Sequence, residues 1–333
     1  IEIRSDMIDK AVELIKRYFE YSLFDWELFV LALVHCYYRS SDTVVFDEYL
    51  IMMGRGNGKN GFISPLAWYL TTHYHGIREY NVDIIANAEE QAKTSFNDVY
   101  NVLERTWEKS KKFFYKSKEI IVNLKTNSYI KFNTSNARTK DGKRSGCLIV
   151  DEEHEYETWD NISVFVSGFG KRKHSRIFKI TTQGKVRGGV LDEDLKLAED
   201  ILYGGIKNLG LLPLLYRIDN KEEAQNPKMW HKANPSLKYL PELQKEMEKD
   251  FVKMQYQPHL AIEFMTKRMN SPAEDFYAAV AEWEKIQAAA SPDRPIPLKE
   301  LEGLECIGAL DYASIRDFAS VGLLFKYKGK RYY

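Results

Sequence analysis

The sequence contains no run of about 18 apolar residues, so it predicts no membrane-spanning helix and no membrane partner. It has only three cysteines, Cys36, Cys147 and Cys306, and their wide spacing fits neither a metal-binding motif nor a disulfide framework. Sparse, separated cysteines are typical of a reducing compartment, and we expect a cytoplasmic protein. Internal repeats and low-complexity tracts are also lacking, and apolar residues make up 44% of the chain, enough for a sizeable core.

Net charge is absent as well, because 48 Lys and Arg residues balance 48 Asp and Glu residues. This balance argues against a protein that coats nucleic acid over its whole surface, although it permits a local basic track. Residues 1–10 alternate charged and apolar side chains, unlike a signal peptide. The chain begins with Ile1 instead of Met, so we expect a trimmed or partial sequence.

Short apolar runs alternate with helical patterns through the first part of the chain. A helix capped by Ser5 and a second helix over residues 26–38, capped by Asp25 and apolar nearly all round, come first. Strands that alternate with helices predict an α/β fold with a mainly parallel sheet flanked by helices on both faces. The expected strands are residues 49–53, 82–86, 147–150 and 176–181, with a hairpin over 120–132 and helices over 62–74 and 89–108.

The pattern changes from about residue 216 onward. Residues 241–270 are mainly helical and charged, and residues 291–297 hold three of the ten prolines, which indicates a linker. Two more strand-like runs follow at residues 306–310 and 320–325. We therefore expect an α/β domain over residues 1–205, a small helical lid and linker over 206–300, and the start of a further domain over 301–333.

A glycine-rich segment, residues 54–61, lies between an expected strand and an expected helix. Glycines let backbone N–H groups converge on phosphate oxygens, and the helix N-terminus adds a favourable dipole. In such a P-loop Lys59 would reach the β and γ phosphates of a nucleotide. The usual pattern has Gly in place of Met53 and Ser or Thr in place of Asn60, whose amide oxygen would bind Mg²⁺ more weakly. A glycine-rich surface turn is the alternative interpretation.

The apolar run 147–150 ends in Asp151 and Glu152. Ligands collect at the carboxyl edge of parallel strands, where Asp151 would hold Mg²⁺ and Glu152 would activate the attacking water. The long interval after Lys59 leaves room for another strand, as in P-loop ATPases of the additional-strand, catalytic-glutamate type. A strand that ends in acidic residues is also common without any function. His154 is either a structural histidine or part of a helicase-like Asp-Glu-x-His box.

Several motifs, in their order along the chain, resemble those of the large terminase subunits of tailed phages. Residues 55–59 resemble the family's arginine-containing Walker A loop, and residues 147–152 its Walker B segment. Residues 181–184 are similar to its coupling motif, and residues 24–27 stand where the family has a Trp-Gln pair against adenine, with Glu27 in place of Gln. Residues 230–237 and 267–270 are similar to the stretches before the lid helices and at the entry to the linker. Residues 308–311 resemble the first strand of its ribonuclease H-like nuclease.

The resemblance implies an ATPase motor that packages double-stranded DNA into a viral procapsid, with ATP and Mg²⁺ as cofactors. It implies as partners duplex DNA, the portal protein with its procapsid, and the small terminase subunit. The subunit would be a monomer in solution, form a ring on the portal, and work in the cytoplasm of a bacterial host. The residues expected to contact ATP are Arg55, Gly56, Asn57, Gly58, Lys59, Asn60, Trp26, Glu27, Thr181 and Thr182.

Asp311, with Asp317 after it, stands where the family has a carboxylate ligand of the two Mg²⁺ or Mn²⁺ ions that cut DNA. The other ligands would lie beyond Tyr333, so residues 301–333 would be the truncated start of the nuclease domain. We expect this polypeptide not to cut DNA, although its full-length parent would. Without the family context, Asp311 is equally well a loop carboxylate after a strand.

Three basic clusters, residues 105–118, 138–144 and 171–176, stand out against the neutral total. Contacts between such side chains and phosphates would hold duplex DNA without sequence preference, whereas solvated helix faces are the alternative. The resemblance also implies an arginine that completes the active site of a neighbouring subunit. Arg138 and Arg144 are the favoured residues for this catalytic role, and Arg55 is the other candidate.

Two other classes of function remain open. A P-loop helicase or remodelling ATPase would share the first half of the chain but needs further helicase motifs and a second RecA-like domain, for which the chain after residue 216 has little room. A nucleotide-binding structural module without turnover is suggested by Met53 and Asn60.

Overall fold

The computed structural model describes residues 1–134, 144–184, 186–207, 210–272, 285, 287–288, 298–311, 320–328 and 330–332. The chain divides into two compact units, Ile1–Ala273 and Glu274–Tyr333, which we describe separately. The expected domain borders at residues 205 and 300 do not coincide with the division after Ala273, and the three expected domains stay predictions. No helix in the described ranges is long and apolar enough to cross a membrane.

The first unit is built on an eight-stranded sheet, and its neighbouring strands from β11 to β8 are parallel, as the sequence predicts. Strands β7 and β6 extend the sheet in antiparallel fashion, which confirms the predicted hairpin between β7 and β8. The strand between β4 and β9 is β10, which follows both in the chain. The order is β11 (Leu211–Leu215), β4 (Glu48–Met52), β10 (Arg176–Thr181), β9 (Cys147–Asp151), β5 (Val82–Ala86), β8 (Ser128–Thr134), β7 (Ile121–Asn123) and β6 (Phe114–Lys116).

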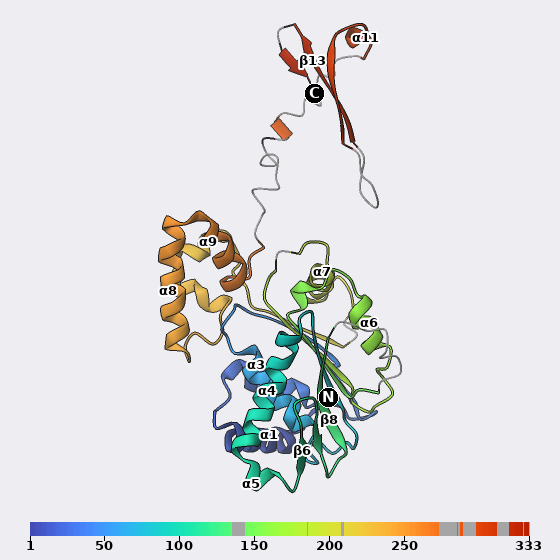
Figure 1. Ribbon diagram of the computed structural model, residues 1–333, viewed down its shortest axis with the longest axis vertical. Helices are drawn as coiled ribbons and strands as arrows, with labels where there is room; N and C mark the ends of the chain where they lie inside the picture. Colours follow the sequence, from blue (N-terminus) through green and yellow to red (C-terminus); the bar gives the residue numbers. More distant parts are fainter. Residues whose placement is uncertain are drawn as a thin grey trace. The chain divides into compact units, whose positions relative to one another are not determined.

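Helices cover both faces of the sheet (Figure 1). Side chains alternate along a strand, so Tyr49 and Ile51 of β4 pack into the core formed with α1 to α4. Leu50 and Met52 face the other way and pack against α7. The helices are α1 (Ser5–Phe19), α2 (Asp25–Val34), α3 (Lys59–Leu70) and α4 (Glu89–Arg105) on one face, and α6 (Asp160–Val166) and α7 (Val190–Leu202) on the other.

A helical subdomain, residues 218–270, follows β11 and keeps a small core of its own around Trp230, Met247 and Phe264, which are almost fully buried. This arrangement confirms that residues 241–270 are mainly helical. Its elements are η3 (Lys221–Gln225), η4 (Pro227–Lys232), α8 (Pro241–Tyr256), α9 (Pro258–Glu263) and the π-helix η5 (Phe264–Arg268).

The second unit contains a short helix, α11 (Leu298–Leu301), and an antiparallel sheet of β12 (Cys306–Asp311), β13 (Ser320–Tyr327) and β14 (Lys330–Tyr332). The two strands expected after residue 300 are therefore confirmed. The expected proline linker, residues 291–297, lies outside the described residues.

Several predicted helix borders are wrong. The helix expected over residues 26–38 ends at Val34, because β2 (Cys36–Tyr38) pairs with β1 (Glu2–Ile3) and β3 (Thr43–Val44). Tyrosines suit such a strand, and pairing on both sides outweighs the apolar helical pattern. The helix is also not buried all round, since Phe29 is 53% exposed.

The expected caps and the two longer helices also need correction. Ser5 and Asp25 are the first helical residues, and the residues before them occupy the cap positions. The helix expected over residues 62–74 starts at Lys59, because the left-handed Gly58 ends the glycine loop three residues earlier than expected, and it ends at Leu70. The helix expected over 89–108 breaks at Thr106 and resumes as α5 (Trp107–Ser110).

Glu27 lies on the first turn of α2 and is only 1% exposed. Its Oε2 accepts a hydrogen bond from the backbone N–H of Phe24 at 2.7 Å, which caps the helix. Burial raises the pKa of Glu27 to about 7, and the Phe24 hydrogen bond offsets only part of that shift. A carboxyl group with a raised pKa holds its proton more tightly in the folded state, so it lowers stability as pH rises from about 4.5 to about 7.

We predict that Glu27→Gln raises the free energy of unfolding by about 2 kcal/mol at pH 8 and changes it little near pH 5. The reason is that the amide keeps the acceptor for Phe24 without a buried charge. Urea unfolding at both pH values measures the effect, with Glu20→Gln at an exposed carboxyl as the matched control. An equal change at both pH values would contradict this account of Glu27.

Candidate functional site

The parallel alignment of β4, β10 and β9 brings three segments to one edge of the sheet. Met52 is level with Thr181, and Ile180 is level with Asp151. The glycine loop after β4 therefore faces the acidic pair at the end of β9. The side-chain Nδ2 of Asn60 lies 2.7 Å from Oδ2 of Asp151, so the two segments are in direct contact.

The glycine loop is shaped by its backbone. Gly56 and Gly58 have φ angles of 90° and 85°, which a residue with a Cβ adopts only with strain. The side chain of Asn57 donates to the carbonyl of Gly54 at 2.9 Å and so closes the loop on itself. Helix α3 starts directly after Gly58, and the first N–H groups of a helix have no acceptor within it. The loop and the helix start together form the kind of amide cradle that binds phosphate oxygens.

Lys59 is 7% exposed, and its Nζ donates to the carbonyl of Met53 at 3.3 Å. Burial lowers the pKa of Lys59, and the negative charges of Glu152 and Asp151 offset part of that shift. A buried ammonium group in such a position gains stability when an anion enters beside it. The residue therefore fits the predicted role of holding nucleotide phosphates.

The acidic pair contains two carboxylates with different properties. Burial and the neighbouring Glu152 raise the pKa of Asp151 to about 6, while Asn60 and Lys59 act in the opposite direction. Burial also disfavours the charged form of Glu152, but the contact with His154 and the charges of Lys59 and Lys267 outweigh it and lower the pKa of Glu152. Glu152 is thus an ionised carboxylate, the form that accepts a proton.

Local backbone geometry fixes the direction of Glu152. Its φ angle is 49°, in the left-handed region that is uncommon for residues other than glycine. A short helical turn, η2 (Glu153–Glu155), follows at once. Glu153 is fully buried, and its Oε1 lies 3.8 Å from Nζ of Lys179, which also pairs with Glu48 and Asp194. Burial raises the pKa of Glu153 well above its usual range, so Glu152 is followed directly by a carboxyl group that favours its neutral form.

A Mg²⁺ ion would find one carboxylate and a nearby amide in this site. Within the described ranges, no group of three or more His, Cys, Asp or Glu side chains is placed to hold a metal. Mg²⁺ commonly takes one or two carboxylates and completes its shell with water and substrate phosphates, so Asp151 fits this role. Asn60 directs its amide nitrogen at Asp151 and at Oγ of Ser95, 3.2 Å away, so it orients the carboxylate. Metal ligation by Asn60 stays a prediction.

His154 and Lys267 belong to the site, although neither was assigned a role from the sequence. Nζ of Lys267 lies 2.9 Å from Nε2 of His154, and Nδ1 of His154 lies 3.2 Å from Oε2 of Glu152 and 3.1 Å from Oγ1 of Thr181. A lysine donates, so Nε2 accepts and Nδ1 carries the proton. The Asp-Glu-x-His spelling was a usable signal for His154, whereas Lys267, which comes from η5, was marked only as part of residues 267–270, similar to the family's entry to the linker.

The helical subdomain packs directly on the glycine loop. The N–H of Gly54 donates to the carbonyl of Ala233 at 2.8 Å, and that of Arg55 donates to the carbonyl of Lys267 at 2.7 Å. A Cβ on Gly54 would lie 2.2 Å from Oδ1 of Asn234, so only glycine permits this approach. A pocket of about 260 Å³ remains between the loop and the subdomain, lined by Arg55, Asp250, Leu260, Glu263, Phe264, Lys267 and Arg268.

The residues expected to contact adenine and to sense the γ phosphate are all buried. Nε1 of Trp26, which is 5% exposed, donates to Oγ of Ser236 at 2.8 Å, and Glu27 caps its own helix. Thr181 accepts from the N–H of His154 at 3.1 Å and donates to the carbonyl of Thr182 at 2.8 Å. Thr181 and Thr182 thus contact the acidic segment, while contact of Trp26 and Glu27 with a base stays a prediction.

Arg144 and Arg176 belong to two of the expected basic clusters but differ in exposure. Arg144 is exposed just before β9, and Arg138 lies outside the described residues. Arg176 does not belong to an exposed basic track, because it is fully buried. It donates to the carbonyl of Val34 at 2.8 Å and to the hydroxyl of Tyr37 at 3.0 Å. Strand pairing draws it into the core as the first residue of β10.

The predicted nuclease residue Asp311 is the last residue of β12, level with Ser320 of β13. Its strand position matches the sequence prediction. Asp317 lies outside the described residues. The metal-binding role of Asp311 stays a prediction.

Solved structures show the same fold. The crystal structure of the HK97 bacteriophage large terminase aligns with 99% of this chain and 67% of its own length, with a TM-score of 0.68 and 15% sequence identity. The large terminase ATPase domain of Thermus phage P74-26 aligns with 78% of this chain and 98% of its own length, with a TM-score of 0.50 and 14% identity.

Sequence comparisons agree with the fold. Protein YmfN of Escherichia coli (strain K12) is 28% identical over 206 residues, and the terminase large subunit of Lactococcus phage p2 is 25% identical over 240 residues. These matches cover 59% and 69% of this chain but only 43% of each relative. Family models of the terminase large subunit match residues 25–200 as its ATPase domain and residues 212–333 as its endonuclease domain. Since the ATPase model alone covers more than half of the sequence, the chain belongs to the terminase large subunit family.

Proposed function

We propose that this chain hydrolyses ATP and thereby drives double-stranded DNA into a phage procapsid. The observation that carries the proposal is the contact between Asn60 and Asp151 at 2.7 Å, beside the buried Lys59 and the ionised Glu152. These residues provide a phosphate cradle, a metal carboxylate and a base at one sheet edge. The match to the family's ATPase domain over residues 25–200 includes all four.

Each residue has a defined task in the proposed reaction. ATP, when bound together with Mg²⁺, would supply the phosphoanhydride bond that is cleaved. Lys59 and the N–H groups of Gly56, Asn57 and Gly58 would hold phosphate oxygens, and Asp151 would hold the metal. Glu152 would accept a proton from the attacking water. The buried setting strengthens each of these electrostatic interactions.

A route of polar contacts supports coupling between hydrolysis and movement. It runs from Glu152, whose Oε2 lies 3.2 Å from Nδ1 of His154 without a hydrogen bond, through His154 to Lys267, whose carbonyl accepts from the N–H of Arg55. A second link joins the N–H of Gln183, after β10, to Oδ1 of Asn270 at 3.0 Å. Loss of the γ phosphate would alter these contacts and shift the helical subdomain, which would move the DNA.

The same proposal includes the partners that the family implies. They are duplex DNA, the portal protein with its procapsid and the small terminase subunit, with a ring of subunits on the portal inside the host bacterium. A nucleotide-binding module without turnover is a second candidate. The observation that favours it is the direction of Asn60, which gives Asp151 an amide N–H instead of a second metal ligand.

We predict that Lys59→Ala abolishes both ATP binding and turnover, because the buried cation is lost. Glu152→Gln should lower turnover by about 10²-fold to 10⁴-fold while ATP still binds, because the amide cannot accept the proton. Phosphate release and equilibrium ATP titration measure the two effects separately, with Glu157→Gln as an exposed control nearby. Binding by the unaltered chain without any turnover in an assembled motor would instead favour the second candidate.

The arginine proposal concerns a neighbouring subunit. We predict that Arg138→Ala with Arg144→Ala removes most ATPase activity of an assembled ring. Mixing this variant with Lys59→Ala subunits should restore part of the activity, because each subunit type supplies what the other lacks. Steady-state ATPase of the mixed rings, compared with each variant alone, tests the arrangement. Unchanged activity of the double arginine variant would exclude both residues as the trans-acting group.

Nuclease activity is a separate proposal for the full-length protein, with Asp311 as one ligand of Mg²⁺ or Mn²⁺. Two-metal cleavage needs several acidic ligands on different strands. We therefore expect no Mn²⁺-dependent nicking of supercoiled plasmid by the polypeptide of residues 1–333. Nicking that disappears with Asp311→Asn would show that this polypeptide already holds a working centre.

A further inference from the structure

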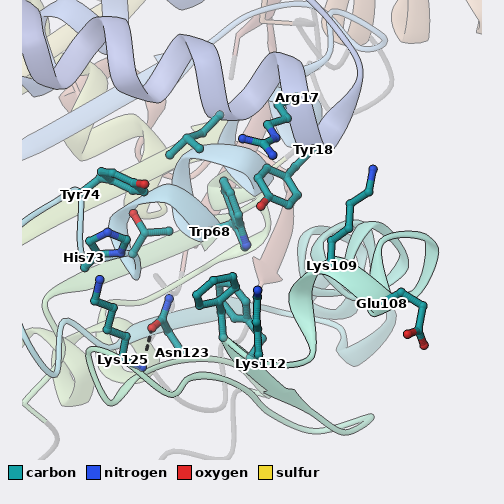
Figure 2. A pocket seen from close by; sticks show the side chains of 14 residues that line it. Arg17, Tyr18, Trp68, His73, Tyr74, Glu108, Lys109, Lys112, Asn123 and Lys125 are labelled. Carbon is teal, nitrogen blue, oxygen red and sulfur yellow. Dashed lines mark hydrogen bonds between the residues drawn. The ribbon is translucent and has the colours of Figure 1, made fainter.

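A pocket of about 520 Å³ lies between α1, α3 and the segment from α5 to β7 (Figure 2). Helix α3 begins at Lys59 of the glycine loop and carries Trp68 in its last turn, about 14 Å further along the axis. The pocket is therefore separate from the proposed nucleotide site. Nothing in the proposed ATPase mechanism makes use of it.

The floor of the pocket is aromatic and contains one unsatisfied donor. Trp68 is only 2% exposed, and its ring lies 5.1 Å from that of Tyr18 and 6.0 Å from that of Phe114. Its Nε1 has no hydrogen-bond partner among the described residues. In Figure 2 His73 and Lys125 lie on one side of Trp68, and Lys109 lies on the other. A buried donor without a partner costs about 1–3 kcal/mol, and since this nitrogen is buried, a ligand meets the aromatic floor and not the N–H group.

The rim of the pocket is basic. Four cations line it, Arg17, Lys109, Lys112 and Lys125, and none of them forms an ion pair within the described part of the chain. The acidic lining residue, Glu108, pairs with Lys111 at 2.5 Å outside the pocket. Four unneutralised cations around one hollow create a positive potential that favours an anionic ligand.

The combination of an apolar floor and a basic rim distinguishes between classes of ligand. Duplex DNA would reach the rim with its phosphates, but its stacked bases cannot reach Trp68 and Phe114. A free nucleobase needs polar partners for its edge, and Oδ1 of Asn123 already accepts from the N–H groups of Lys125 and Thr126. A peptide satisfies both features, because an apolar side chain covers the aromatic floor and flanking carboxylates meet the cations.

We propose that this pocket docks an acidic peptide segment of a partner protein, with one apolar side chain seated on Trp68 and Phe114. The rim aromatics extend the apolar surface that such a side chain would cover, since Tyr74 and Phe113 are 43% and 40% exposed. The pocket volume lies within the usual range of ligand sites, about 300–1,000 Å³.

The test uses short fluorescein-labelled peptides in which one Phe, Leu, Ile, Met or Trp is flanked by Asp and Glu. Fluorescence anisotropy with the whole chain should show binding in the micromolar range by at least one peptide. The same peptide with Asn and Gln in place of the acids should not bind. Lys112→Glu with Lys125→Glu should weaken binding at least about tenfold, because like charges then face each other.

The matched control is Lys249→Glu, the same charge change on an exposed position of α8, which should leave binding unchanged. If the double variant fails to fold, Lys112→Glu alone and the amide peptide on the unaltered chain still decide the question. Failure of every acidic peptide to bind at millimolar concentration overturns the proposal. So does equal binding of the amide peptide, or displacement of a bound peptide by ATP or by a duplex, which would assign the pocket to phosphate.

Discussion

The parallel register of β4, β10 and β9 is the constraint on which the site depends. Since the three strands run in the same direction, the segments that follow them all emerge at one edge. The glycine loop, the acidic pair and Thr181 therefore lie close together, although they are far apart in the sequence. A shift of one residue in this pairing would turn Asp151 toward the opposite face of the sheet and separate it from Asn60.

Buried charge gives the site its chemistry. Lys59 loses solvation, and its pKa falls, while the pKa of Asp151 rises and that of Glu152 falls. Two adjacent carboxylates thus acquire different properties, because burial and the charge of Glu152 raise the pKa of Asp151, whereas His154, Lys59 and Lys267 outweigh the effect of burial on Glu152. Environments that separate the pKa values of neighbouring acids are typical of sites with distinct acid and base roles.

The helical subdomain is part of the same site. Its carbonyls at Ala233 and Lys267 accept from the glycine loop, and the side chain of Lys267 reaches His154 beside the acidic strand. Movement of the subdomain relative to the sheet would break both sets of contacts together. The arrangement makes the loop sensitive to the position of residues far along the chain, which is the property that the proposed motor function needs.

How much the sequence predicts differs between features. The strand at residues 82–86 and the strand at 176–181 were predicted with their borders, because short apolar runs between turns leave few alternatives. The helix expected over residues 26–38 failed because β2 gains partners on both sides, which no local pattern shows. The exposed basic track at residues 171–176 failed at Arg176 for the same kind of reason, since tertiary contacts bury it.

The sequence by itself determined the residue types of the site, because a glycine loop before a helix and an acidic pair after a strand are local patterns. Only the tertiary structure decided that Lys267 stands against His154 and that Ser236 holds Trp26. These contacts join positions more than a hundred residues apart. Their energies depend on tertiary packing, which cannot be inferred from the spacing of residues in the sequence.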